Sequence, residues 1–246
     1  MKNSVFPKDY IQTVNGKKTI VTGKGKPLIF LHGFMSSKEA FCRQIRYFSS
    51  YFTVYAPDLT GFGENAEMPF PYSLDDYAEE LKELIKFVGG KTYVAGHSFG
   101  CRIAIKTAAT SDLIEKLVLC GAAGLKPAFS LKKCIKRMSY KLSKPFLSQE
   151  KCEKIFFSPD YRMTAGNLRK SFKLITSEYL DKYISKIACP TFCIFGENDR
   201  ETPPYFMKRL IKQIPDCAGV TMKNCGHFCF AEKPDEFNCI VKEFLL

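Results

Sequence analysis

The sequence lacks any apolar run close to the ~20 residues that a membrane-spanning helix needs. Its longest apolar runs, around Pro27–Leu31 and Ile187–Phe195, have the length of single strands. The first residues, Met1 to Lys8, also lack the apolar stretch of a signal peptide. We therefore expect a cytoplasmic protein.

The sequence also lacks the cysteine spacings of redox and metal sites. None of its 11 cysteines stands in a C-x-x-C pair. The tightest cluster is Cys225-x-His227-x-Cys229, and it has no second ligand pair elsewhere in the chain. A chain of this length needs no disulfide bonds to fold. We therefore predict no metal, no cofactor and mostly buried thiols, which act as small core hydrophobes in a reducing compartment.

Negative charge is scarce in one part of the chain. The segment from Lys126 to Lys186 contains 15 basic and 5 acidic residues, a local charge of +10. The remaining 22 basic and 20 acidic residues nearly balance. With 246 residues, of which 46% are apolar, the chain is long enough for one large domain with a sizeable core. The uneven charge indicates an inserted module with its own surface task.

Outside the basic segment, short apolar runs alternate with amphipathic stretches. Ser73 is a typical helix N-cap, and Asp75 and Asp76 follow in the first turn, where negative charge is favoured. The alternation predicts an α/β fold, with a mostly parallel twisted sheet covered by helices on both faces. The expected strands are 27–32, 52–56, 92–95, 117–120, 191–195 and 219–222, and the expected helices are 39–50, 74–88, 99–109, 204–214 and 234–246.

Ser98 stands where an expected strand ends and a helix begins, within Gly96-His97-Ser98-Phe99-Gly100. A sharp turn of this kind strains its central residue and leaves room only for small residues two positions before and after it. The turn exposes the serine hydroxyl, and the helix N-terminus favours negative charge that develops beside it. The pattern predicts that Ser98 is a nucleophile. The alternative is a glycine-rich turn with an incidental serine.

A serine nucleophile needs a general base, and the chain has only three histidines. His97 adjoins Ser98 on a tight turn, so their side chains should diverge. His32 ends a strand, where its ring should bond to nearby backbone. His227 follows the last expected strand, and a loop at the carboxyl edge of a parallel sheet can reach the same crevice as Ser98. We therefore predict that His227 is the base, with a capping or core histidine as the alternative.

The third member should be a carboxylate that orients the imidazole and stabilises its cation. We choose Asp199, in the loop after the strand at 191–195. Glu197 and Glu201 are its rivals, and we expect both to be solvated. The resulting order along the chain is Ser98, Asp199, His227.

In its motifs and their order, the sequence resembles the α/β-hydrolase superfamily, in the small single-chain branch with a helical cap. The matching segments extend over nearly the whole chain: His32-Gly33-Phe34, Asp58-Leu-Thr-Gly61-Phe-Gly63, Gly96-His97-Ser98-Phe99-Gly100, Gly196-x-x-Asp199-x-x-x-Pro203 and Gly226-His227. The resemblance implies an α/β-hydrolase core at 1–124 and 188–246 and a helical cap, or lid, at 125–187. It also implies an oxyanion hole formed by the backbone N–H groups of Phe34 and Phe99.

The sequence departs from this pattern at two positions. Relatives often carry a second glycine after the nucleophile turn and a serine after the Gly-x-Gly segment, where this chain has Cys101 and Glu64. Neither position carries chemistry. Dehalogenases and epoxide hydrolases of this fold use an aspartate nucleophile, so Ser98 argues against both activities.

The cap contains one strongly amphipathic stretch. Leu131, Ile135, Met138 and Leu142 form an apolar stripe at helical spacing. The other surfaces are occupied largely by Lys132, Lys133, Lys136, Arg137, Lys141 and Lys144. One hypothesis is a lid whose apolar face meets the substrate pocket and whose cations attract anionic substrates. The other is a solvated basic face that packs through its apolar stripe. Contact with a membrane surface is a further alternative, and nucleic acid is not expected because no recognition motif accompanies the charge.

These observations predict a serine hydrolase that forms an acyl-enzyme on a small-molecule acyl substrate, such as a carboxylic ester. An acyltransferase, or a hydrolase or lyase that cleaves a C–C bond, would use the same triad and is the first alternative. A non-catalytic small-molecule receptor on this fold is the second.

Overall fold

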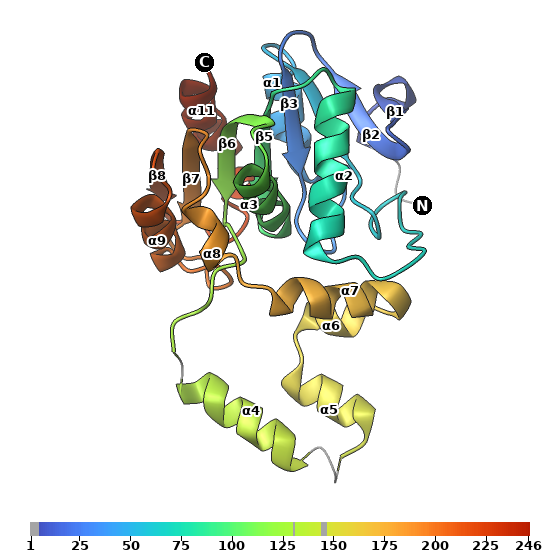
Figure 1. Ribbon diagram of the computed structural model, residues 1–246, viewed down its shortest axis with the longest axis vertical. Coiled ribbons are helices and arrows are strands. Elements are labelled where there is room, and N and C mark those ends of the chain that lie inside the picture. Colours follow the sequence, from blue (N-terminus) through green and yellow to red (C-terminus); the bar gives the residue numbers. More distant parts are fainter. Residues whose placement is uncertain (1–4, 130, 144–146) are drawn as a thin grey trace.

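The computed structural model describes residues 5–129, 131–143 and 147–246. An eight-stranded sheet forms its centre, in the order β1-β2-β4-β3-β5-β6-β7-β8 (Figure 1). The pairs β1–β2 and β2–β4 are antiparallel and the others are parallel. This topology confirms the predicted fold class. The strands are β1 (Ile11–Val14), β2 (Lys17–Thr22), β3 (Pro27–Leu31), β4 (Thr53–Pro57), β5 (Thr92–His97), β6 (Ile114–Cys120), β7 (Thr191–Gly196) and β8 (Cys217–Met222).

The hairpin of β1 and β2 was not predicted from the sequence. Its turn is made by Asn15, with φ 46°, and Gly16, with φ 74°. Left-handed backbone at both positions is typical of the two-residue turns that join antiparallel strands, and Asn-Gly is their strongest sequence signal. The dipeptide would therefore have indicated the hairpin.

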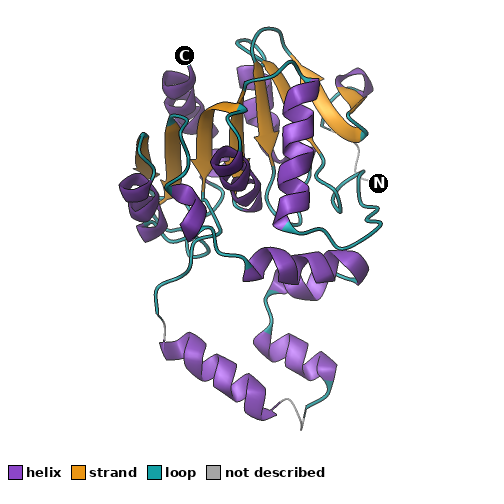
Figure 2. Cartoon of the chain, in the orientation of Figure 1, coloured by secondary structure: helices purple, strands orange, loops and turns teal. Residues whose placement is uncertain are grey.

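Helices cover both faces of the sheet and enclose two hydrophobic layers (Figure 2). One layer is covered by α2 (Leu74–Phe87), α3 (Phe99–Thr110) and α9 (Tyr205–Gln213), and the other by α1 (Cys42–Phe48) and α11 (Pro234–Leu245). Along β3, Ile29 and Leu31 enter the first layer while Leu28 and Phe30 enter the second. A strand that is buried on both faces has a continuous apolar sequence, which explains the run at 27–31.

Most local expectations agree with the structure. The Ser73 side chain accepts the N–H of Asp76, whose carboxylate accepts the N–H of Ser73, so a capping box begins α2. The helix expected at 39–50 is instead a short 3-10 helix, η2 (Lys38–Phe41), followed by α1. The remaining short elements are η1 (Lys8–Tyr10) and α10 (Cys229–Glu232).

Within the described residues, five helices lie between β6 and β7. They are α4 (Leu131–Ser143), α5 (Gln149–Phe156), α6 (Pro159–Met163), α7 (Gly166–Ser177) and α8 (Asp181–Ile184). The helices α6 and α7 lie below the carboxyl ends of the parallel strands, whereas α4 and α5 project away from the body (Figure 1). Hydrogen bonds and ion pairs attach α7 and the residues after it to the body. Among them, Ser171 Oγ accepts the N–H of Tyr72 at 2.6 Å, and Lys106 Nζ pairs with Glu178 Oε1 at 2.7 Å. The bounds of a separate lid at 125–187 stay a prediction.

The apolar stripe of α4 is exposed. Leu131, Ile135, Met138 and Leu142 have exposed fractions between 56% and 68%. The hypothesis that the cap packs through this stripe is therefore wrong for the described residues. Lys144, the last of the basic residues predicted to surround the stripe, lies outside them. Every described helix is too short or too polar to span a bilayer.

Candidate active site

Ser98 occupies a strained turn between β5 and α3. Its φ is 50°, in the left-handed region that residues with a side chain seldom adopt. A Cβ atom on Gly96 would lie 2.8 Å from the backbone nitrogen of Cys101, and one on Gly100 would lie 2.2 Å from the carbonyl oxygen of Leu31. Both positions therefore require glycine, as the spacing predicted, and the turn places Ser98 at the carboxyl edge of the sheet.

Asp199 and His227 contact each other in the loops that follow β7 and β8. The Nδ1 atom of His227 lies 2.8 Å from Oδ2 of Asp199. The Asp199 side chain is fully buried and that of His227 is 6% exposed. Of the rivals, Glu201 is 67% exposed, and a Glu197 carboxylate oxygen accepts the N–H of Asn224. Asp199 is therefore the carboxylate that holds Nδ1 of His227.

Thr202 is a further residue of this cluster, and we did not predict it. Its hydroxyl donates to Asp199 Oδ2 at 2.7 Å, and the N–H groups of Glu201 and Thr202 donate to Oδ1 at 2.9 Å. Burial alone would raise the pKa of Asp199, but the hydrogen bonds from His227 and Thr202 outweigh burial and lower that pKa. The carboxylate is thus kept ionised and fixed. An aspartate whose side chain binds the backbone two residues on is a common turn pattern, and it is the signal that could have revealed this loop.

Backbone contacts bring Ser98 and His227 to the same point of the sheet edge. The N–H of Ser98 donates to the carbonyl oxygen of Cys120 at 3.0 Å. A Cβ on the next residue, Gly121, would lie 3.1 Å from the His227 ring. Among the described residues the Ser98 hydroxyl makes no hydrogen bond, and Nε2 of His227 instead lies 3.5 Å from Oε2 of Glu201. Contacts between a nucleophile and its base are often long in unliganded enzymes and tighten with substrate.

His97 supports the loop that carries His227. Its Nε2–H donates to the backbone carbonyl of His227 at 3.0 Å, and its ring lies 5.0 Å from the ring of Phe228. The side chain is buried. Burial, together with repulsion by the charge of His227, lowers the pKa of His97 to about 3. A neutral ring therefore serves as a hydrogen-bond donor here.

His32 orients the peptide group between Gly33 and Phe34. The His32 Nε2 atom accepts the N–H of Leu59 at 3.1 Å, so Nδ1 carries the proton and donates to the Gly33 carbonyl at 2.8 Å. The N–H and C=O of a trans peptide point in opposite directions. The Phe34 N–H therefore points away from His32.

The two predicted oxyanion donors are both available. Phe99 is the first residue of α3, so its N–H is one of the donors that a helix leaves without a partner. In the described part of the chain, neither the Phe34 nor the Phe99 N–H has an acceptor. Their rings lie 5.7 Å apart between centroids. The role of these two amides in an oxyanion hole stays a prediction.

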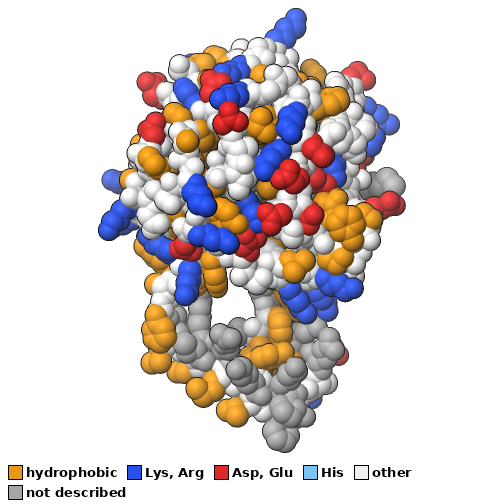
Figure 3. Space-filling view, viewed as in Figure 1, with side chains coloured by type: hydrophobic (Ala, Val, Ile, Leu, Met, Phe, Trp, Pro, Cys, Tyr) orange, Lys and Arg blue, Asp and Glu red, His pale blue; other side chains and the backbone are white. Residues whose placement is uncertain are grey.

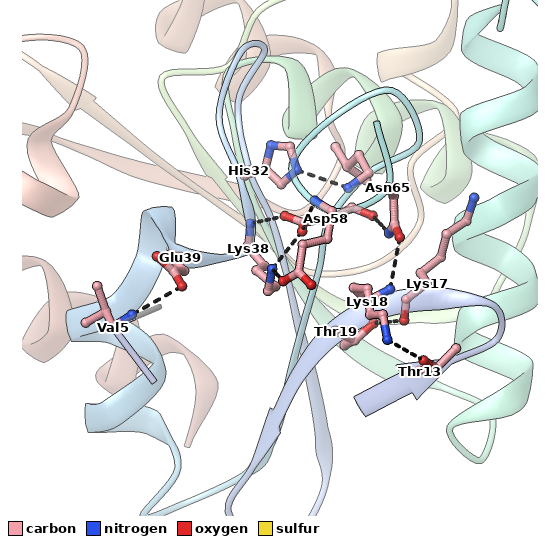
Figure 4. Close-up of polar contacts among 12 residues, drawn as sticks. Val5, Thr13, Lys17, Lys18, Thr19, His32, Lys38, Glu39, Asp58 and Asn65 are labelled. Atoms are coloured by element: carbon pink, nitrogen blue, oxygen red, sulfur yellow. Dashed lines mark hydrogen bonds and ion pairs between the residues drawn. The ribbon is translucent and has the colours of Figure 1, made fainter. Parts of the chain in front are cut away.

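A buried ion pair fixes the loops that follow β3 and β4 (Figure 4). Asp58 Oδ2 lies 2.8 Å from Lys38 Nζ, and Oδ1 accepts the N–H of Lys38 at 2.7 Å. The N–H of Glu64 donates to the same carboxylate at 2.9 Å. A Cβ on Gly63 would lie 2.3 Å from Asp58 Cγ, so glycine is required there. Asp58 and Gly63 thus have structural roles. Glu64, one of the two positions that depart from the family pattern, forms a second ion pair with Lys38.

Replacing Asp199 with asparagine is expected to lower kcat by about 10³- to 10⁴-fold, because an amide in that position favours the wrong imidazole tautomer. The matched control is Glu201→Gln, which removes the exposed carboxylate beside Nε2 and should change kcat by less than about threefold, as for an exposed charge pair. Steady-state kinetics on an activated ester measures both. A larger loss in Glu201→Gln than in Asp199→Asn would show that the acid is misassigned.

Lowering the pH below about 6.5 is expected to destabilise the fold through its buried histidines. Burial lowers the pKa of His32 and His97, whereas the unfolded chain takes up these protons near pH 6.5. Their stabilising contribution is complete above about pH 6.5 and is lost as the pH falls, at up to about 1.4 kcal/mol per pH unit for each ring. Urea unfolding at pH 7, 6 and 5 measures the slope. His97→Gln should reduce this slope by up to about 1.4 kcal/mol per pH unit, the contribution of one proton. An unchanged slope would refute this account.

Comparisons with known proteins agree with this fold. A sequence model of the alpha/beta hydrolase family matches residues 28–238. The 2-hydroxy-6-oxo-6-(2'-aminophenyl)hexa-2,4-dienoic acid hydrolase of Metapseudomonas resinovorans is 24% identical, over 91% of this chain and 85% of that protein. Lipase 1 of Psychrobacter immobilis is 26% identical, over 86% of this chain and 74% of the lipase.

The fold is also shared with solved structures. A serine hydrolase involved in carbazole degradation has a TM-score of 0.75 and 23% sequence identity, and the match covers 96% of this chain and 97% of that one. The relatives named here are hydrolases. The sheet topology, the turn that carries Ser98 and a family match over most of the sequence together show that this chain belongs to the alpha/beta hydrolase family.

Proposed function

We propose that the chain is a serine hydrolase that cleaves a small carboxylic ester, or a related acyl substrate, through an acyl-enzyme on Ser98. The observation that carries the proposal is the Asp199–His227 pair, joined at 2.8 Å and placed at the same sheet edge as the strained Ser98 turn. A buried acid, an imidazole and a strained serine converge there. Such a constellation activates a hydroxyl that is otherwise a weak nucleophile.

In the first half of the reaction, Nε2 of His227 takes the proton of the Ser98 hydroxyl while Oγ attacks the substrate carbonyl. The N–H groups of Phe34 and Phe99 stabilise the negative oxygen of the tetrahedral intermediate, a contribution of about 3–4 kcal/mol for each donor in comparable sites. His227 then returns the proton to the leaving alcohol, and the acyl group stays on Ser98. In the second half, His227 takes a proton from water, which attacks the acyl-enzyme carbonyl. His227 then returns that proton to Ser98 Oγ as the bond to the acyl carbon breaks, which releases the acid and free Ser98.

The side chains around the oxyanion donors favour an apolar acyl group. The Phe34 ring lies 5.0 Å from Phe62 and 5.0 Å from Phe172, which α7 contributes. The Phe62 ring lies 6.0 Å from that of Phe99. These four rings place apolar surface beside the two amides. We infer that the acyl side of the substrate is hydrocarbon rather than charged.

The charge near the imidazole also disfavours an anionic acyl group. Glu201 lies 3.5 Å from His227 Nε2. A carboxylate so placed repels negative charge close to the scissile bond. An anionic group on the substrate would therefore lie farther out, toward the basic cap.

The proposal is tested with p-nitrophenyl esters of graded chain length. The expected result is a burst of about one p-nitrophenol per protein, followed by slower turnover, with kcat/KM that rises as the acyl chain grows. Such a burst is the kinetic fingerprint of an acyl-enzyme. Absence of release above the rate without protein, for every ester, would refute the proposal.

Salt dependence separates steering by the cap from the chemical step. The Debye length falls from about 10 Å at 0.1 M salt to about 3 Å at 1 M, which screens the attraction of the cap for an anion. We expect kcat/KM for a mono-p-nitrophenyl dicarboxylate to fall at least threefold between 0.05 and 0.5 M salt. The neutral p-nitrophenyl butyrate should change little. Equal responses of the two esters would exclude steering.

A second candidate is cleavage of a C–C bond beside a carbonyl group. It is favoured by the relative named as a 2-hydroxy-6-oxo-6-(2'-aminophenyl)hexa-2,4-dienoic acid hydrolase, whose match covers 91% of this chain. The discriminating measurement is kcat/KM on a 2-hydroxy-6-oxo-dienoic acid compared with an ester of similar size. An acyltransferase would instead show ester products when an alcohol is added.

A further inference from the structure

The helix α4 presents an apolar face that the rest of the chain leaves uncovered. At about 100° per residue, positions 131, 135, 138 and 142 fall within a sector of about 60° on a helix. All four side chains in that sector are exposed, Met138 at 63% and Leu142 at 68%. The helix has 13 residues, so the stripe is about 20 Å long. Contiguous exposed apolar surface of this kind marks a site of interaction.

The packing of α4 shows which way this face points. Tyr140 lies on the opposite side of the helix from the stripe, and its ring contacts Phe156 and Phe157 at 5.4 Å between centroids. The helix therefore packs against α5 through the face opposite the stripe. Apolar side chains gather along the outer edge of α4, away from the opening that separates the helix from the body (Figure 3). In this arrangement the stripe faces solvent rather than the active site.

The charge of α4 selects the kind of partner. Its 13 residues, LKKCIKRMSYKLS, include five lysines and arginines and no acidic residue. Two copies of this chain would bring ten like charges together if they met through α4, which disfavours self-association through this face. An anionic surface attracts the cations, but only one with an accessible hydrocarbon layer also covers the stripe. A nucleic acid, or an acidic peptide without apolar side chains, would leave the stripe exposed to water.

We propose that α4 docks the protein on an anionic lipid surface, with its axis parallel to that surface and its apolar stripe inserted among the acyl chains. Helices of this composition, basic and amphipathic with low mean hydropathy, lie in the plane of the lipid–water interface. Each lysine or arginine close to an anionic leaflet adds to the attraction, and the effect falls off within a Debye length. The docking is independent of the chemistry proposed at Ser98.

The experiment is co-sedimentation of the whole chain with vesicles of phosphatidylcholine alone and with vesicles that contain one-fifth phosphatidylglycerol. The test variant carries Ile135→Ser with Met138→Ser. The matched control is Phe87→Ser, because Phe87 is 64% exposed at the end of α2 and far from the stripe in sequence. Circular dichroism and thermal unfolding show that each variant is folded. Turnover of a soluble ester should be the same in all three proteins.

The wild type and Phe87→Ser are expected to bind the anionic vesicles at least tenfold more tightly than the neutral ones, and 0.5 M salt should weaken this binding. The double variant should bind the anionic vesicles at least tenfold less tightly than the wild type. Equal binding by the double variant and the wild type would overturn the proposal, as would equal binding to both vesicle types. Loss of a dimer in the double variant, seen by light scattering without any vesicle binding by the wild type, would assign the stripe to a second copy and would also overturn it.

Discussion

Replacing Ser98 with alanine is expected to lower kcat by about 10⁵-fold or more, since the loss of a triad nucleophile leaves only the oxyanion donors and substrate binding. The fold should be unaffected, because the Ser98 hydroxyl has no hydrogen-bond partner among the described residues and its side chain is only half-buried. Ester turnover and the free energy of unfolding in urea measure the two effects. KM should change little, because Ser98 is not expected to bind the ground state.

A matched control is Ser111→Ala at the other end of α3, where the hydroxyl donates to the Thr107 carbonyl at 2.9 Å. It should cost about 1 kcal/mol of stability and leave kcat unchanged. Ser98→Ala with more than a tenth of the wild-type kcat would rule out the nucleophile. Unfolding of that variant at a much lower urea concentration would show that its loss of activity is structural.

His227→Ala is expected to be about as damaging as Ser98→Ala, because the serine hydroxyl without its base is a weak nucleophile. The informative variant is the double one. Residues that act as a unit in catalysis are strongly non-additive, so Ser98→Ala with His227→Ala should be no slower than either single variant by more than about threefold. The three values of kcat on one ester measure this.

Two different results would contradict the assignment of His227. If the losses multiplied in the double variant, the two residues would act independently. If His227→Ala kept most of the wild-type kcat, another group would be the base. The free energy of unfolding serves as the control, since the carbonyl of His227 accepts a hydrogen bond from His97 and that backbone contact survives the substitution.

Local chemistry explains why much of the fold and of the candidate site could be predicted. The run at Pro27–Leu31 is apolar because its alternate side chains enter two different layers. The glycines at 96 and 100 are demanded by backbone atoms less than 3 Å from any Cβ, so their spacing around Ser98 marks the turn. The ends of parallel strands meet at one edge of the sheet, which is why loops far apart in sequence were expected to bring Asp199 and His227 together.

The features that escaped prediction depend on contacts that leave a weaker trace in the sequence. Thr202 is polar and lies in a loop, and only the fold shows that its hydroxyl holds the carboxylate of Asp199. The approach of Glu201 to His227 Nε2 depends on the path of the same loop. The stripe on α4 has the spacing of a core face, but the face around Tyr140 packs instead, so periodicity alone misidentified which side is buried.

The most direct test of the central claim is to locate the adduct of a fluorophosphonate probe. In this reaction Ser98 Oγ forms a bond to phosphorus and fluoride leaves, and His227 takes the serine proton. Mass spectrometry of peptides from the labelled, folded protein identifies the modified residue. We predict one adduct, on Ser98, which is absent from the His227→Ala variant and from protein unfolded in urea. A folded wild-type protein that stays unlabelled, or that is labelled at another residue, would contradict the account.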